Sequence, residues 1–148
     1  MSYSLVLCLH VLAATVWTGG HIVLFAAILL PALKFRDYRR VTDFEQYFEK
    51  IGIPALGILV VTGLTLAHWQ LPDINLWFTL KSTASRTIAT KMLLLLLTLT
   101  LALHARLRLI PGLQEKTLRN LALHIALVTL TGILFVLTGV LHRFGGIW

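Results

Sequence analysis

The sequence predicts an all-α integral membrane protein, folded as a bundle of four transmembrane helices in one domain, residues 1–148. Of the 148 residues, 57% are hydrophobic and 13% are charged, whereas soluble domains hold roughly 45–50% apolar and about 25% charged residues. The mean hydropathy is +0.85. The apolar residues form four long runs, and a helix needs about 20 such residues to cross the hydrocarbon core of a bilayer.

Proline and glycine mark the ends of these runs. Pro54 fits an early turn of the second helix, where proline is tolerated. The third helix stops before Pro111 and the fourth before Gly145. The first run is longer than a membrane requires, so its helix must tilt or project beyond the bilayer. The predicted helices cover about residues 4–33, 51–70, 87–109 and 118–144.

The basic residues predict the orientation of the bundle. The first connection, residues 34–50, contains five lysines and arginines, and the stretch around the third connection, residues 106–119, contains four. By the positive-inside rule both connections are cytoplasmic, so both termini face outward. The first connection also carries several aromatic residues and is expected to form an amphipathic helix at the membrane surface. The net charge of +7 therefore indicates lipid headgroups, not nucleic acid, as the partner.

All six histidines fall inside the predicted helices and none falls in a loop. An ionisable residue within a membrane is costly and often marks an ion path, a cofactor or a relay. The alternative is that each histidine is a packing residue that bonds to a neighbouring helix. By depth, the outer layer contains His10, His68, His142 and Lys91, the inner layer contains His104 and His124, and His21 lies nearer the middle.

The facing of the histidines predicts two tiers of sites. His10 and His21 are eleven residues apart, about 1100° around the helix, so they differ by about 20° and share a stripe with Trp17. His124 and His142 are five turns apart, on one face and roughly 27 Å along the axis. A second, inner site is therefore predicted to use His124 with His104 or His21.

Haem b is the cofactor that best fits this pattern. Imidazole is a good axial ligand, and a four-helix bundle has room for a flat macrocycle between facing helices. One or two haems are expected, with Lys91, Arg106 or Arg143 pairing with propionates. Copper is the alternative, although soft Cu(I) favours thiolate and thioether ligands and the chain has one cysteine and two methionines. The predicted metal ligands are His10, His68, His142 and His124.

Three stretches carry a family resemblance. "LHVLAATVWTGGHIVLFAAILLPAL", "PALGILVVTG" and "ATKMLLLLLTLTLALHARLRL" resemble the CopD family of bacterial inner-membrane proteins and its relative HemJ, the membrane protoporphyrinogen oxidase. The resemblance to CopD implies copper uptake or resistance, and that to HemJ implies haem b and porphyrinogen oxidation. The two key HemJ positions map to His10 and Lys91. This chain reads "RNLALH" where HemJ has an Asn-Glu-x-Pro stretch.

The sequence thus predicts a redox protein of the bacterial inner membrane that transfers electrons to or from quinone, a small oxidant or a partner protein. A membrane oxidoreductase activity and assembly into an oligomer are both compatible with this prediction. The alternatives are copper transport or resistance, porphyrinogen oxidation, and a cofactor-free subunit. All six acidic residues are expected in loops, so no paired carboxylates are expected in the bundle. No Walker or Rossmann glycine pattern occurs.

Overall fold

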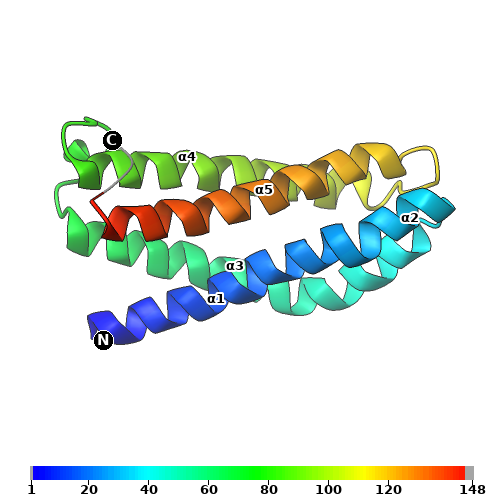
Figure 1. Ribbon diagram of the computed structural model, residues 1–148, viewed down its shortest axis with the longest axis horizontal. Coiled ribbons are helices and arrows are strands. Elements are labelled where there is room, and N and C mark those ends of the chain that lie inside the picture. Colours follow the sequence, from blue (N-terminus) through cyan, green and yellow to red (C-terminus); the bar gives the residue numbers. More distant parts are fainter. Residues whose placement is uncertain (1, 146–148) are drawn as a thin grey trace.

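The computed structural model describes residues 2–145, and every regular element in that range is helical (Figure 1). The first long helical segment consists of two α-helices with a π-helical segment between them. The helical segment before the last helix also ends in a π-helical segment. The elements are α1 (Tyr3–Val23), η1 (Leu24–Leu29), α2 (Leu30–Phe35), α3 (Arg39–Gln70), η2 (Ile74–Leu76), α4 (Thr83–His104), η3 (Ala105–Leu109) and α5 (Leu118–Arg143).

Four continuous helical segments are long and apolar enough to cross a membrane, which confirms the predicted fold class. Helices suit this role because each satisfies its backbone hydrogen bonds internally. Large apolar side chains such as Leu12, Val61 and Leu96 are exposed on the outside of the bundle, where lipid would cover them. These helical segments are Tyr3–Phe35, Arg39–Gln70, Thr83–Leu109 and Leu118–Arg143.

Helix α3 begins twelve residues earlier than the sequence indicated. Residues 39–50, expected as part of a loop with its own surface helix, are the first turns of α3. The chain reverses instead at residues 36–38, with Arg36 in the left-handed conformation at φ 55°. The helix extends this far because it has an apolar face to bury: Val41 and Phe48 are both buried, and α3 packs against α1 and η1.

The long helices pair as neighbours. Helix α1 packs along α3, α4 packs along α5, and α1 also packs on α5. Figure 1 shows two ends to this bundle. The "terminal end", on the left, contains Tyr3, residues 71–82 and Arg143, and the "basic end", on the right, contains residues 36–38 and 110–117.

The apolar core lies mainly at the basic end. Leu24 and Leu29 of η1 are almost completely buried there, beside Val41 of α3 and Leu121 of α5. A smaller cluster around Trp77 closes the terminal end, where the indole Nε1 donates a hydrogen bond to the Leu71 carbonyl at 2.7 Å. Between these two clusters the interior contains polar side chains.

Candidate functional site

The centre of the polar interior is the imidazole of His10. It lies half-buried on α1, with Nδ1 2.8 Å from Oγ1 of Thr62 on α3. The Thr62 hydroxyl donates its own proton to the Ile58 carbonyl, so Thr62 must accept the bond from His10 Nδ1–H. That tautomer places the imidazole lone pair on Nε2. Gly63 makes room for the ring, because a Cβ atom there would lie 3.2 Å from His10 Cε1.

Lys91 of α4 reaches the same interior. A Cβ atom at Gly139 of α5 would lie 3.5 Å from Lys91 Nζ, and the lysine charge acts electrostatically on His10. The structure therefore brings together His10 and Lys91, two positions at which the sequence predicted a site. An ammonium group in this place favours an anionic group beside it.

His142 closes the interior at the terminal end. Its Nδ1 lies 3.0 Å from Oγ1 of Thr87 on α4, and its Nε2 contacts the side-chain amide of Gln70 on α3. The imidazole of α5 thus connects three helices.

The predicted outer layer is not a single layer in the structure. The rings of Tyr3 and Trp69 are 6.0 Å apart, which puts the start of α1 level with the end of α3, where Gln70 contacts His142. His10 follows Tyr3 by seven residues and so lies roughly 10 Å deeper. His68, the third predicted member, is exposed, and its side chain makes no hydrogen bond within residues 2–145.

His21 lies deeper still and is buried. Its Nδ1 donates to the Trp17 carbonyl at 2.8 Å, which again leaves the lone pair on Nε2. The ring packs 4.4 Å from the Trp17 ring and 5.4 Å from Phe48. His10 and His21 therefore both face inward, as their spacing predicted. Thr129 of α5 donates to the His21 carbonyl, which places His21 at the depth of the middle of α5.

His104 and His124 form a direct pair toward the basic end. His124 Nδ1 donates to the Asn120 carbonyl at 3.0 Å. Its Nε2 therefore accepts from His104 Nδ1, 2.8 Å away. The structure thus places these two predicted inner residues side by side and keeps His21 apart from them. Their role as a cofactor site stays a prediction.

The remaining predicted residues differ in placement. Arg143 is exposed at the terminal end. Arg106, on η3, forms an ion pair with Glu49 of α3. Asp43, Glu45 and Glu49 all lie on α3, so our expectation that all acidic residues are in loops was wrong for these three. Within residues 2–145, no group of three histidine, cysteine, aspartate or glutamate side chains is placed to hold a metal ion.

Sequence reasoning missed the polar partners of the histidines. Thr62, Thr87 and Gln70 each contact a predicted site residue. The signal that could have found one of them is the recurring Thr-Gly pair, because Thr62-Gly63 contacts His10 through both of its residues. The pair recurs at residues 131–132 and 138–139. Small residues of this kind allow close helix packing in membranes, but the sequence alone does not say which side chain packs there.

Comparison with known proteins gives one match. The family model for Copper resistance protein D matches residues 42–143, a segment that runs from the first turn of α3 to the end of α5. No curated protein and no solved structure matches the chain. With four apolar helices, the match identifies a multi-pass membrane protein. Since the matched segment is more than half of the chain, the protein belongs to the Copper resistance protein D (CopD) family.

Proposed function

We propose that the protein carries copper ions through the interior of its bundle, with imidazoles as successive ligands. The observation that carries this proposal is the series of histidines at increasing depth. His142 lies at the terminal end, His10 roughly 10 Å deeper, and His21 near the middle. His124 and its partner His104 lie toward the basic end, roughly 27 Å from His142 along α5. Membership of the copper-resistance family supports copper as the ion.

The donor set suits an ion in transit. Imidazole is a good ligand for copper, and His10 and His21 each offer one imidazole in the interior. Conduction requires sites that bind strongly enough for entry but weakly enough for release. Low ligand numbers meet that requirement, and residues 2–145 contain no three-ligand group that would trap the ion.

Hydrogen bonds orient two of these imidazoles for the task. His10 donates from Nδ1 to Thr62, and His21 donates from Nδ1 to the Trp17 carbonyl. In each case Nε2 keeps its lone pair. A second partner that fixes the tautomer and the ring orientation is the usual support for a metal-binding histidine.

Haem b binding is the second candidate, and Lys91 is the observation that favours it. An ammonium group beside His10 opposes a copper cation but would pair well with a haem propionate. His10 would hold the haem without His142, because the two imidazoles differ by roughly 10 Å in depth. Bound haem would supply one-electron redox chemistry, either for electron transfer with quinone or a partner, or for HemJ-like porphyrinogen oxidation.

Copper uptake into vesicles tests the proposal. The purified protein is reconstituted, and copper entry is followed by mass spectrometry of the vesicle contents. We expect His10→Ala to lower the uptake rate at least tenfold, because it removes the ligand between the terminal end and His21. The matched control is His68→Ala, which changes an exposed histidine and should leave uptake unchanged. Equal rates in wild type and His10→Ala would refute the copper route.

The absorption spectrum separates the two candidates. A Soret band at about one haem per chain, lost in His10→Ala, would overturn the copper proposal in favour of haem b. The stoichiometry in His124→Ala then reports on the inner pair, since a second haem there would make the wild-type ratio two and the variant ratio one.

A further inference from the structure

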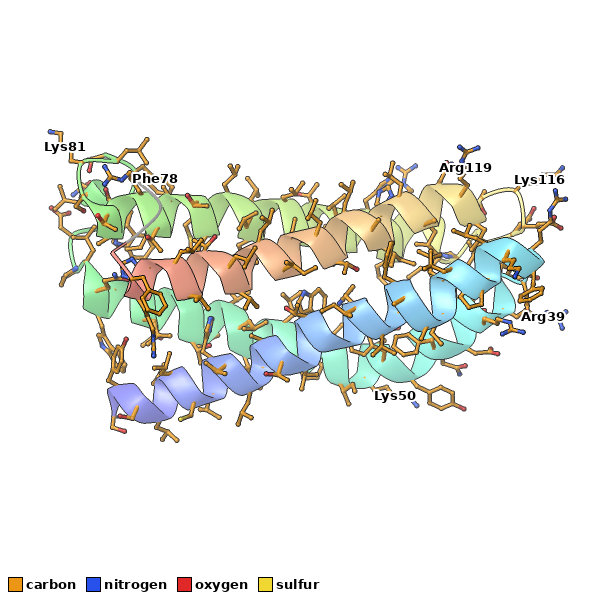
Figure 2. The ribbon with its side chains drawn as sticks, in the orientation of Figure 1. Arg39, Lys50, Phe78, Lys81, Lys116 and Arg119 are labelled. Carbon is orange, nitrogen blue, oxygen red and sulfur yellow. The ribbon has the colours of Figure 1, made fainter. Side chains whose placement is uncertain are left out.

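A pocket of about 440 Å³ opens at the basic end of the bundle, and no histidine is among its lining residues. Its walls come from the end of α2, the loop before α5 and the first turn of α5. Figure 2 shows Lys116 and Arg119 at this end. The lining residues that matter here are Leu33, Arg36, Glu115, Lys116, Leu118 and Arg119.

The pocket carries excess positive charge. Arg36 and Glu115 neutralise one another in an exposed ion pair with Nη1 and Oε1 3.4 Å apart. Lys116 and Arg119 form no ion pair within the described part of the chain, which leaves a net charge of about plus two. Both cations also flank the start of α5.

That position is unfavourable for a cation. The N-terminus of a helix carries a partial positive charge and is stabilised by anions. Helix α5 has no acidic residue in its first turn, and its N-cap residue, Thr117, makes no side-chain capping bond. The side chains of Lys116 and Arg119 repel the partial positive charge of this terminus and repel one another. An anion bound between them would therefore stabilise the site.

The surroundings give the chemical class of that anion. Leu33 and Leu118 line the same pocket, and the buried core around Leu121 lies one turn further along α5. The cations therefore lie where the apolar part of α5 begins, at headgroup depth for a spanning helix. We propose that this pocket binds the phosphate group of an anionic phospholipid, with its acyl chains against the exposed side chain of Leu33. The inference is independent of the proposed function.

Lipid binding by the whole protein tests this site. Native mass spectrometry of the detergent-solubilised protein measures the affinity for phosphatidylglycerol, with phosphatidylcholine as the zwitterionic control. We expect the double change Lys116→Gln, Arg119→Gln to weaken phosphatidylglycerol binding roughly tenfold or more, since each basic residue contributes strongly near an anionic headgroup. Glu115→Gln should strengthen it, a gain that misfolding does not produce.

The matched control removes two positive charges outside the pocket. Arg39 and Lys50 lie on α3 and are not among the residues that line the pocket. In Figure 2, Arg39 lies below Lys116 at the same end of the bundle, and Lys50 lies at its lower edge. The double change Arg39→Gln, Lys50→Gln should weaken phosphatidylglycerol binding less than threefold. An equal loss in both double variants would show diffuse surface attraction and overturn the site. Binding of inorganic phosphate that prevents lipid binding would overturn the lipid as its ligand.

Discussion

Replacing Gly20 with alanine should destabilise the bundle, because the ring of Phe48 on α3 packs directly against this glycine of α1. A Cβ atom at position 20 would lie 2.1 Å from Cε2 and 2.3 Å from Cζ of Phe48. These separations are far below van der Waals contact, so the Phe48 ring or the helix backbone must move.

The Phe48 ring has little freedom to move. It is 7% exposed, with Phe44 stacked 5.5 Å away and the rings of Trp17 and His21 at 6.4 and 5.4 Å. Overpacking of this kind costs about 3 kcal/mol at the upper end of its usual range. Alanine regains about 1 kcal/mol of helix propensity relative to glycine. The net loss in the free energy of unfolding is therefore about 2 kcal/mol.

Gly19→Ala is the matched control, because a Cβ atom at position 19 would meet nothing within 4 Å. In detergent, titration with a denaturing surfactant followed by circular dichroism should give a lower unfolding free energy for Gly20→Ala, and an unchanged or higher one for Gly19→Ala. Adding Phe48→Leu to Gly20→Ala should recover part of the loss. If Gly20→Ala and Gly19→Ala unfold at the same surfactant fraction, the close contact of α1 with Phe48 does not exist in the protein.

Two further predictions concern orientation and helix packing. A reporter that is active only outside the cytoplasm, fused after residue 148 (outside the described residues), should be active, because the basic connections should stay in the cytoplasm; activity of a cytoplasm-only reporter there would reverse the orientation. Thr131→Val should lower the unfolding free energy by about 1 kcal/mol, because Thr98 donates a buried hydrogen bond to the Thr131 hydroxyl at 3.0 Å. Thr138→Val, whose hydroxyl bonds only within its own helix, should change it less, and equal effects would contradict this role of the Thr98 bond.

The sequence predicted the helices well because hydropathy and length alone decide whether a segment can cross a membrane. Angular spacing also predicted correctly that His10 and His21 face the interior, since facing depends only on the helical period. Depth was harder. Whether His10 is level with His142 depends on how α1 slides against α3, and packing at contacts such as that of Tyr3 with Trp69 fixes it.

The start of α3 was missed for a related reason. Residues 39–50 alternate charged and aromatic side chains, which indicated a surface segment separate from the apolar run after it. These residues are compatible with a helix, and burial of Val41 and Phe48 joins them to the span as one continuous helix. Hydropathy marks where the membrane-compatible part of a helix begins, but tertiary packing decides where the helix itself begins.

The family match and the histidine positions together show why α1 matters to the proposed route. The matched segment, residues 42–143, lacks α1, and on α5 the imidazoles of His142 and His124 are roughly 27 Å apart. An ion cannot pass directly between ligands at that separation. His10 and His21, both on α1, divide the interval into shorter steps, and α3 and α5 position them through Thr62 and Thr129. On the copper proposal, α1 therefore supplies the middle of the route, and the family segment supplies its two ends together with the side chains that hold α1 in register.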